Sequence, residues 1–442
     1  MIRYVIPSLL AVLLLPAEPL RAQQLYFPPV SGTEWSVTDP QELGYDAQAI
    51  QDLYAYLGER RSDAFLLLVD GKIVLEKYWE GFPPDSVHYW ASAGKTLLAA
   101  AVGIAEAEGS VDLAVPSSDY LGAGWTDCGA EAEARITVLD HLRMTTGLDE
   151  AHEFFCTEPE CLRCIADPGA RWAYHNGPFT KLHDLIEAAT GQTPTQFVRQ
   201  RFRARTGITG AYLPLGPDNQ VFFSTPRVMA RYGLLLLNRG AWDGEQVIPA
   251  DFHARMTRPS QPANESYGLL TWLNGQSTHM VNGSQTVFAG PLLPDAPADA
   301  YFAAGKNGQF LNVAPQSRLV WLRMGAEPVT GEEEYVGVNF NNEIWKRVNA
   351  LTGGTTASRR IPEPLAGLQV FPNPAGEWVT LRWPDGAGRY ELTDALGRRV
   401  LGGRTEGPET KVSLQGLPAG IYRLLVYEAA GRSHRATLAV RD

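Results

Sequence analysis

The chain has 442 residues, more than one ordinary domain needs, and 45% of them are hydrophobic, so a large buried core is possible. Its formal net charge of −11 argues against binding of nucleic acid through bulk electrostatics. We interpret the acidic balance as that of a solvated surface, since no basic block stands out against it.

The N-terminus has the pattern of a secretory signal peptide over residues 1–22. Arg3 supplies the positive head, residues 4–15 are a short apolar core, and cleavage is predicted after Ala22. Because Pro16 ends the apolar run early, the alternative of a transmembrane anchor is disfavoured. No later stretch is long and apolar enough to span a membrane. We therefore expect a soluble protein, exported through the periplasm and then secreted or held at the cell surface, rather than a cytoplasmic one.

The segment before residue 90 has the pattern of a helix followed by two strands. Apolar periodicity predicts a helix over Gln48–Leu57. Ala64–Val69 and Lys72–Tyr78 are strand-like runs on either side of Asp70–Gly71, which is a two-residue hairpin signal. This region is therefore expected to supply the first hairpin of a sheet.

A serine and a lysine with catalytic spacing open the next predicted helix. Ser92 and Lys95 precede an apolar run that Gly109 ends, and their three-residue spacing puts both side chains on one helical face. A serine hydroxyl is a poor nucleophile until a base takes its proton, and a desolvated amine can act as that base. The helix N-terminus adds positive potential where negative charge develops. Taken alone, such a pair more often marks an N-capping serine beside a surface lysine.

Four cysteines follow this helix: Cys128, Cys156, Cys161 and Cys164. The last three lie close together, but no second ligand pair or His-x-x-x-His accompanies them, so a zinc site is disfavoured. Disulfide bonds fit an exported protein better than free thiols do. Four cysteines allow three pairings, and the sequence does not choose among them. The pairing that we favour joins Cys156 to Cys161 and Cys128 to Cys164.

The rest of the first domain is predicted to be helical first and then largely β-stranded. Two helices, three strands and a closing helix are expected over Thr180–Thr190, Thr195–Arg205, Tyr267–Leu273, Gln309–Val313, Arg318–Met324 and Asn341–Leu351. Together with the first hairpin, these elements predict an α+β fold, in which an antiparallel sheet is flanked by helices and carries a helical lobe.

Two further short motifs occur once each, in order, after the serine. They are Tyr174–His175–Asn176 and Lys306–Asn307–Gly308. Together with Ser92 and Lys95, they resemble the Ser-x-x-Lys, Tyr-x-Asn and Lys-x-Gly motifs of the serine β-lactamase and penicillin-recognising family, and its class C-type branch in particular. That branch includes β-lactamases, carboxylesterases, D-aminopeptidases and nylon-oligomer hydrolases.

Connecting segments resemble the same family. His141–Leu148 and Thr225–Leu237 are similar to two of its helical segments. The resemblance covers roughly residues 40–350, and it implies a β-lactamase/transpeptidase-like fold for a hydrolase domain at residues 23–351.

The resemblance implies a role for most residues of these motifs. Ser92 is the nucleophile that becomes acylated, Lys95 is the general base, and Tyr174 is a second proton carrier. Asn176 orients Lys95 and binds a substrate carbonyl, while Lys306 holds a substrate carboxylate or tunes Tyr174.

The third motif completes the expected substrate-binding set with Asn307, Gly308 and Gln309. The resemblance implies an oxyanion hole formed by the backbone N–H groups of Ser92 and Gln309. The family commonly has a threonine where this chain has Asn307, and this departure argues against β-lactams as substrates. From the residues alone, the third motif is also typical of an ordinary hairpin turn.

Aromatic side chains crowd these motifs, and a few are expected to line an apolar acyl pocket. They are Tyr89, Trp90, Trp172, Phe179, Phe302 and Phe310. His175, at the variable middle position of the second motif, is expected in the pocket wall. The histidines form no metal signature such as His-Glu-x-x-His, so neither a metal nor another cofactor is expected.

The C-terminal region differs in kind from the rest. Residues 352–366 have the composition of a linker, and residues 367–442 show short apolar alternations typical of a small all-β, Ig-like sandwich. Val370–Ala375 and Leu417–Tyr422 resemble signature segments of a type IX secretion C-terminal sorting domain. This resemblance implies the type IX secretion machinery as a partner. An Ig-like carbohydrate-binding or adhesion module is the alternative.

These observations predict a secreted serine hydrolase that acts through an acyl-enzyme on small esters, amides or peptides. A β-lactamase or D-aminopeptidase of the same family is the nearest alternative. A non-hydrolytic penicillin-binding or sensing protein is the alternative from another functional class.

Overall fold

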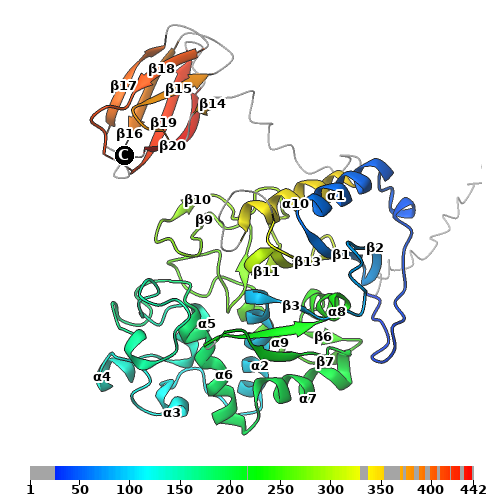
Figure 1. Cartoon of the computed structure of the whole chain (residues 1–442). Helices are drawn as coiled ribbons and strands as arrows, with labels where there is room; N and C mark the ends of the chain where they lie inside the picture. The colour runs from blue at the N-terminus through cyan, green and yellow to red at the C-terminus, as the bar shows by residue number, and fades with distance from the viewer. Residues whose placement is uncertain are drawn as a thin grey trace, which may run out of the picture. The chain divides into compact units, whose positions relative to one another are not determined.

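A computed structural model describes residues 25–216, 218–328 and 337–352 and, near the C-terminus, 369–371, 375–382, 388–393, 399–405, 409–418, 420–428 and 433–440. The chain divides into two compact units, residues 1–355 and 356–442 (Figure 1). The predicted signal peptide and almost all of the predicted linker lie outside the described residues. Within the described residues, no helix combines the length and the apolar character that crossing a membrane requires.

A six-stranded antiparallel sheet forms the centre of the first unit, with its strands in the order β2-β1-β13-β12-β11-β8. Their bounds are β1 Ser62–Val69, β2 Lys72–Tyr78, β8 Trp272–Leu273, β11 Tyr301–Gly305, β12 Gln309–Ala314 and β13 Leu319–Gly325. The predicted turn at Asp70–Gly71 joins β1 to β2, and both of its residues have the positive φ that such a turn needs. The first hairpin therefore pairs with strands that come more than 200 residues later, through β1 and β13.

Helices cover both faces of this sheet (Figure 1). α1 (Ala47–Glu59) and α10 (Val338–Ala350) pack on each other, and Trp345 of α10 packs edge-on against Trp321 of β13. α8 (Pro226–Leu237) packs across β1, β12 and β13. Both predicted flanking helices, at the start and at the end of the domain, are therefore present.

The remaining helices form a lobe beside the sheet. They are α2 Lys95–Ala107, α3 Ser118–Leu121, α4 Ala130–Glu133, α5 Val138–Arg143, α6 Asn176–Thr190, α7 Pro194–Thr206 and α9 Ala250–Met256. α2 lies at the centre of the lobe, in contact with α6, α7 and α9, and its side chains are buried from Lys95 to Ala105. A helix that is buried all round needs small or apolar residues on every face, which explains its run of alanines and leucines.

Short elements complete the unit. The 3-10 helices are η1 Pro40–Leu43, η2 Ala91–Gly94, η3 Pro159–Cys161 and η4 Lys306–Gly308. The minor sheets consist of β3 His88–Tyr89 with β5 Gln220–Ser224 and β4 Ala211–Pro214, of β6 Ala241–Trp242 with β7 Glu245–Gln246, and of β9 Thr278–His279 with β10 Phe288–Ala289.

The ends of the lobe helices follow local capping chemistry. α7 begins with a capping box between Thr193 and Gln196, has Pro194 in its first turn, and ends at Gly207 in the left-handed conformation. These signals explain why the predicted helix at Thr195–Arg205 is so close to the observed one.

One predicted strand is largely wrong. Of Tyr267–Leu273, only Trp272–Leu273 forms a strand, β8. The backbone N–H of Gly268 donates to the carbonyl of Thr271, and that of Leu270 donates to Leu142 in the lobe. Because these backbone groups are engaged elsewhere, the apolar run turns into the core before it can join the sheet.

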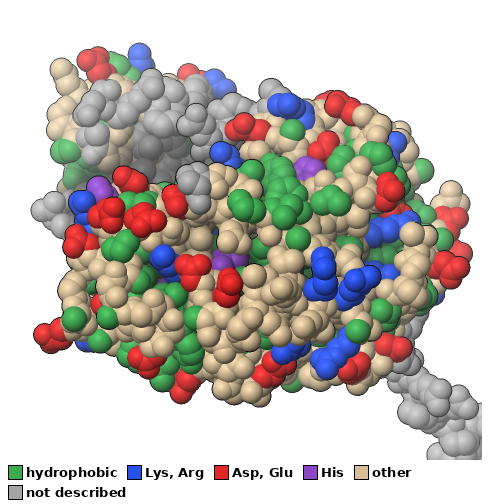
Figure 2. All heavy atoms as spheres, turned by 60° about the horizontal axis from the view of Figure 1, so that its bottom comes forward, with side chains coloured by type: hydrophobic (Ala, Val, Ile, Leu, Met, Phe, Trp, Pro, Cys, Tyr) green, Lys and Arg blue, Asp and Glu red, His purple; other side chains and the backbone are tan. Residues whose placement is uncertain are grey.

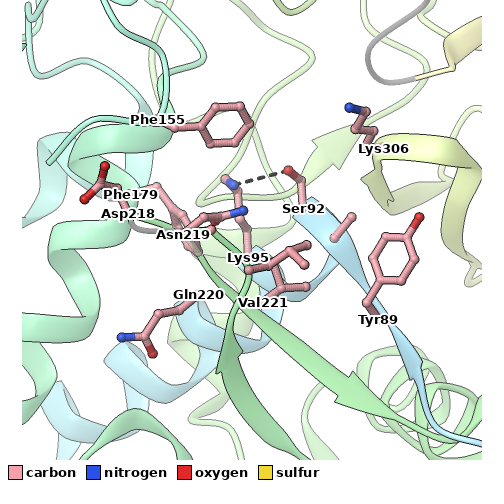
Figure 3. A pocket seen from close by; sticks show the side chains of 13 residues that line it. Tyr89, Ser92, Lys95, Phe155, Phe179, Asp218, Asn219, Gln220, Val221 and Lys306 are labelled. Atoms are coloured by element: carbon pink, nitrogen blue, oxygen red, sulfur yellow. Dashed lines mark hydrogen bonds between the residues drawn. The ribbon is translucent and has the colours of Figure 1, made fainter.

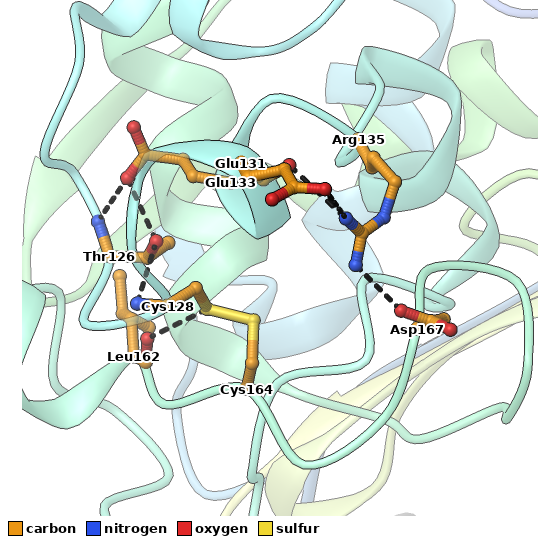
Figure 4. The surroundings of a disulfide bond; sticks show 8 residues. All are labelled: Thr126, Cys128, Glu131, Glu133, Arg135, Leu162, Cys164 and Asp167. Atoms are coloured by element: carbon orange, nitrogen blue, oxygen red, sulfur yellow. Dashed lines mark hydrogen bonds and ion pairs between the residues drawn. A yellow bond between two sulfur atoms is a disulfide. The ribbon is translucent and has the colours of Figure 1, made fainter.

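The structure contains the favoured disulfide pairing, Cys128–Cys164 and Cys156–Cys161. Figure 4 shows the first bond beside buried Glu133, whose carboxylate accepts hydrogen bonds from the backbone N–H and the hydroxyl of Thr126, each at 2.8 Å. Both bonds lie between α3 and α6, and their later cysteines hold the stretch 144–175, in which η3 is the one helix.

The second unit is all β in its described residues. It has two antiparallel sheets, β14-β15-β18 and β17-β16-β19-β20, as the predicted sandwich requires. The strands are β14 Gln369–Phe371, β15 Trp378–Arg382, β16 Gly388–Thr393, β17 Arg399–Thr405, β18 Glu409–Ser413, β19 Gly420–Glu428 and β20 Ser433–Val440. Val379, Leu381, Leu424 and Leu438 are among the fully buried side chains of its core.

Acidic side chains are scattered across the face of the molecule that Figure 2 shows, with basic side chains among them. This distribution is what an acidic, solvated surface looks like.

Candidate active site

The first motif lies where η2 passes into α2, against the end of strand β11. Ser92 is in η2 and Lys95 is the first residue of α2. Trp90, the residue before η2, is fully buried, and its indole N–H donates to the Ser224 hydroxyl at 2.8 Å. Gly305 at the end of β11 lies so close that a Cβ there would come within 2.9 Å of the Ser92 backbone nitrogen. A glycine is therefore required at position 305 for the sheet to approach the serine.

Lys95 joins the serine to the second motif, and Figure 3 shows its hydrogen bond to Ser92. Its Nζ donates to Ser92 Oγ at 3.2 Å and to Asn176 Oδ1 at 2.7 Å. The Nζ atom also lies 3.9 Å from the centroid of the Phe179 ring. Lys95 is only 3% exposed, and this burial lowers its pKa to about 7. Near neutral pH, a large share of the side chain is therefore an uncharged amine, able to accept a proton.

Asn176 occupies the first position of α6 and is 1% exposed. Its Nδ2 donates to the Thr180 hydroxyl at 3.3 Å and to Asn219 Oδ1 at 3.4 Å. Because Nδ2 is held in this way, Oδ1 is aimed at Lys95. The sequence placed Asn176 beside Lys95, and it did not anticipate Asn219.

Tyr174 packs inside an aromatic cluster next to Lys95. Its ring centroid is 5.5 Å from Lys95 Nζ, and the ring stacks at 5.8 Å on Trp272 and at 6.3 Å on Phe154. The residue is 2% exposed. The two predicted proton carriers are therefore neighbours, on the buried side of the site.

A pocket of about 300 Å³ opens above Ser92 and Lys95. Its remaining lining residues are Tyr89, Ala91, Phe155, Phe179, Leu215, Gly216, Asp218, Asn219, Gln220, Val221 and Lys306. Two of the predicted aromatic residues, Tyr89 and Phe179, are among them. Trp90, Trp172, Phe302 and Phe310 are instead buried in the core.

The third motif contributes less to this pocket than the sequence predicts. Lys306 lines the pocket, but Asn307, Gly308 and Gln309 are not in its lining. The Asn307 side chain donates to the Tyr89 hydroxyl at 2.8 Å, in a backbone conformation with φ 65°. Gln309 is fully buried, and its amide donates to the Gly325 carbonyl at 2.6 Å and accepts from its N–H at 3.1 Å. The motif forms the tight turn η4 between β11 and β12, so its later residues are directed into the sheet.

A fully buried arginine holds this turn. The Arg323 guanidinium donates to the backbone carbonyls of Asn307 and Gly308 and to the Ser62 hydroxyl. Burial lowers its pKa to about 9, so it remains largely protonated at neutral pH. Nothing in the sequence pattern marked Arg323, because it is one polar residue inside an apolar strand.

Sequence analysis also missed two walls of the pocket. Phe155, 42% exposed, directly precedes Cys156 of the Cys156–Cys161 bond. The second wall comes from the connection between β4 and β5 and from the start of β5; its lining residues are Leu215, Gly216, Asp218, Asn219, Gln220 and Val221. The glycine and prolines of the second segment signal a loop, but no local pattern shows that it reaches Ser92.

His175 is 1% exposed and is not in the pocket lining, so its expected place in the wall is wrong. Its ring packs against Phe154, and burial lowers its pKa to about 4. His175 precedes α6 in extended conformation, and its ring lies against Phe154, which is outside the pocket lining, rather than in the wall of the pocket.

One group of potential metal ligands occurs in the described residues: Glu153, Cys156 and Cys161. Because the two cysteines are bonded to each other, neither offers a thiolate, and the group does not make a metal site.

Comparisons with known proteins agree with this architecture. Residues 50–334 match the family model described as Beta-lactamase, and residues 369–438 match the Secretion system C-terminal sorting domain. A 6-aminohexanoate-dimer hydrolase from Paenarthrobacter ureafaciens is 37% identical over 75 residues, which are 17% of this chain. This alignment spans only 19% of that protein.

Solved structures share the fold at low identity. A putative beta-lactamase from Bacteroides dorei has a TM-score of 0.56 at 14% identity, covering 70% of this chain and 99% of that one. A putative 6-aminohexanoate-dimer hydrolase from Bacillus anthracis has a TM-score of 0.54 at 19% identity, covering 74% and 89%. A penicillin-binding protein homologue from Pyrococcus abyssi has a TM-score of 0.52 at 14% identity, covering 89% and 96%. These likenesses confirm the predicted fold.

Proposed function

Because the chain belongs to the beta-lactamase family and ends in a secretion sorting domain, we propose that it is an exported serine hydrolase that cleaves small esters or amides through an acyl-enzyme. The observation that carries the proposal is the buried Lys95 amine, 3.2 Å from Ser92 Oγ, with its pKa lowered to about 7. A base that is half neutral near working pH is suited to take a proton from serine.

Acylation begins when neutral Lys95 takes the proton of the Ser92 hydroxyl and Ser92 Oγ bonds to the substrate's carbonyl carbon. The carbonyl oxygen then carries negative charge. Collapse of this intermediate breaks the bond to the leaving group, which receives a proton through Lys95 and Tyr174. Asn176 keeps Lys95 aimed at the serine throughout. Water later attacks the acyl carbon by the same route, and the acid product leaves.

The backbone N–H of Ser92 is one donor to the developing oxyanion. The sequence analysis expected the backbone N–H of Gln309 as the second donor. We propose the backbone N–H of Lys306 instead. Lys306 follows Gly305, the residue of β11 that packs against the Ser92 nitrogen, and it lines the pocket. Gln309 lies beyond the turn and is fully buried.

Small esters and linear amides are the substrates that this pocket favours. Its volume of about 300 Å³ and its Phe155, Phe179 and Leu215 side chains suit a short apolar acyl chain. Asn307, where the family commonly has a threonine, is committed to Tyr89, which argues against binding of a β-lactam carboxylate there. The relative from P. ureafaciens is named for hydrolysing a dimer of 6-aminohexanoate, so amides belong among the substrates to test.

Export follows from the C-terminal domain. We propose that a signal peptide at 1–22 carries the hydrolase domain, 23–351, into the periplasm. The linker at 352–366 then connects it to the sorting domain at 367–442, which the type IX secretion machinery recognises. No cofactor takes part in the proposed reaction.

The test is steady-state hydrolysis of p-nitrophenyl butyrate by the full chain and its Ser92→Ala variant. Ser110→Ala is the matched control, because Ser110 follows the far end of α2. We expect turnover in the wild type and in Ser110→Ala, and its loss in Ser92→Ala. Turnover that survives in Ser92→Ala would show that another residue is the nucleophile. An acyl adduct that forms without turnover would favour a penicillin-binding or sensing protein.

A further inference from the structure

The small sheet β3-β5-β4 presents an apolar face beside the pocket. It already contributes two lining residues, Tyr89 of β3 and Val221 of β5. Its register places five side chains on one face, because directly paired residues point the same way and successive residues along a strand alternate. We call these side chains the outer face. They are Tyr89, Ala211, Leu213, Val221 and Phe223.

The opposite face of this sheet belongs to the core. Tyr212 and Phe222 are buried there with their ring centroids 5.0 Å apart, and Phe222 also packs edge-on against Trp90. An antiparallel sheet that covers a core with one face commonly carries polar side chains on the other. The outer face is apolar instead, although Leu213 is 46% exposed and most of its neighbours there are half-buried. Apolar surface of this kind marks a binding site.

The outer face continues into the pocket. Leu213 is paired with Val221, which lines the pocket. Leu215 follows two residues after Leu213, is 49% exposed and belongs to the same lining. Phe155, 42% exposed, adds a further apolar wall. A ligand that occupies the pocket can therefore extend over the outer face without leaving apolar surface.

This continuity identifies what covers the outer face. None of its five side chains carries a charge, and the Tyr89 hydroxyl already accepts a hydrogen bond from Asn307 at 2.8 Å, so an apolar ligand fits it best. Because the outer face and the pocket share residues, a protein seated there would cover the entrance to Ser92. A substrate that reacts with Ser92 can instead lay its own apolar chain across the face.

From this arrangement we propose that the preferred substrate is an ester of a medium-length, unbranched fatty acid. The first carbons of its acyl chain occupy the pocket, and the later carbons lie on the outer face over Leu213. The proposal rests on the hydrolase function proposed above. In the reaction, the bond between the acyl carbon and the alcohol oxygen breaks. The acyl carbon gains a hydroxyl from water and the alcohol oxygen gains a proton, so the products are a fatty acid and an alcohol.

The apolar chain belongs to the acyl part of the substrate. Figure 3 shows Phe155 and Phe179 on the side of Ser92 where Lys95 lies, and Lys306 on the other side. Lys306 is exposed and charged, so an apolar chain laid over it would remove its ammonium group from water without replacing the lost hydrogen bonds. The side of Lys306 therefore suits the smaller alcohol part.

The test compares kcat/KM for p-nitrophenyl decanoate and p-nitrophenyl butyrate, each below the concentration at which the longer ester aggregates. We expect the full-length wild type to prefer decanoate about tenfold or more, because its additional methylene groups leave water on the outer face. Leu213→Ser should remove most of this preference, and Leu213→Met should keep it. Val37→Ser is the matched control. Val37 is 71% exposed and pairs with Ile73 on the edge strand β2, which three strands separate from β11.

A wild type that cleaves butyrate as well as decanoate would overturn the proposal, while the hydrolase function stood. An equal change of the ratio in Leu213→Ser and Val37→Ser would overturn it as well. Light scattering tests the alternative occupant: if Leu213→Ser turned a dimer into a monomer and left the ratio unchanged, the outer face would join two copies of the chain. A wild type that cleaves neither ester would instead contradict the hydrolase function itself.

Discussion

Two buried basic residues, Lys95 in the pocket lining and Arg323 behind the turn η4, show how the same burial can serve different purposes. Lys95, at the start of α2, is 3% exposed and has two hydrogen-bond acceptors, Ser92 Oγ and Asn176 Oδ1. Arg323, on β13, is fully buried and surrounded by acceptors. These are Ser62 Oγ and the backbone carbonyls of Arg60, Arg61, Asn307, Gly308 and Ala326.

The number of acceptors decides what each cation can do. Too few acceptors surround Lys95 to replace its lost hydration, so its pKa falls to about 7 and the amine can exchange protons. Arg323 keeps a pKa of about 9 and a planar fork of donors, so it stays charged and fixes the turn that carries Lys306. One cation is prepared for chemistry, and the other is a positioning residue.

The largest effect is expected when Lys95 is replaced by methionine. Loss of the general base should lower kcat/KM for p-nitrophenyl butyrate by about 10³-fold or more. The same change should raise the free energy of unfolding by about 1–2 kcal/mol, because it removes a desolvated amine from an apolar site. Urea denaturation measures the second effect, with Lys181→Met on α6 as the control. A less stable Lys95→Met variant would contradict the view that Lys95 is strained by burial.

Arg323→Met should have the opposite effect on stability. It leaves several buried carbonyls without donors, so we expect a loss of about 3–5 kcal/mol in the free energy of unfolding. The matched control is Arg231→Met, since Arg231 is also buried and donates to the carbonyls of Thr206 and Pro29.

Only the Arg323 variant should also raise KM for carboxymethyl heptanoate, because it alone releases the turn that carries Lys306. If Arg231→Met changed this KM as much, the positioning role of Arg323 would be refuted.

The pH dependence of activity separates the two cations further. Below a pH of about 7, kcat/KM should fall about tenfold per pH unit as Lys95 becomes protonated, and above it the profile should level off. A profile that stays flat from pH 5 to 8 would count against Lys95 as the base.

The free energy of unfolding should also depend on pH through Lys95. The pKa of Lys95 is about 7 in the folded chain and 10.5 when unperturbed. Between these values the unfolded chain binds more protons, so the free energy of unfolding should rise with pH over this range. Urea denaturation at pH 7 and pH 9 measures the rise, and Lys95→Met should lack this contribution.

The smallest effect concerns the disulfide bonds. Replacing Cys156 and Cys161 by serine should lower kcat/KM several-fold, because Phe155, which lines the pocket, directly precedes Cys156. Replacing Cys128 and Cys164 should cost more stability, about 3 kcal/mol, because that bond closes a longer loop. The Cys128 and Cys164 replacement should leave kcat/KM nearly unchanged. If the two double variants affected kcat/KM equally, the wall formed by Phe155 would not matter.

The parts of the site that the sequence predicted are those fixed by short-range geometry. Three-residue spacing at a helix start places Ser92 beside Lys95 whatever the rest of the fold does. The order of motifs then identifies Asn176 as the partner of Lys95. The two disulfides agree with the pairing that was favoured but not fixed by the sequence.

The parts that the sequence could not predict depend on where distant segments meet. Whether Lys306 or Gln309 reaches the pocket depends on which strand lies against Ser92. Only the structure shows that this is β11, whose Gly305 packs so closely on the Ser92 backbone that a side chain would clash. Asp218 and Phe155 reach the pocket from loops with no periodic pattern. The run at Tyr267–Leu273 has the composition of a strand, but its backbone bonds go to the lobe.

The central claim, that Ser92 forms a covalent acyl-enzyme with Lys95 as its base, is tested most directly by intact-mass spectrometry after treatment with an alkyl fluorophosphonate. The account predicts one phosphonyl adduct per full-length chain, located on Ser92 by peptide mapping, formed more slowly in Lys95→Met and absent from Ser92→Ala. An adduct that persists in Ser92→Ala, or a wild type that forms none, would contradict it.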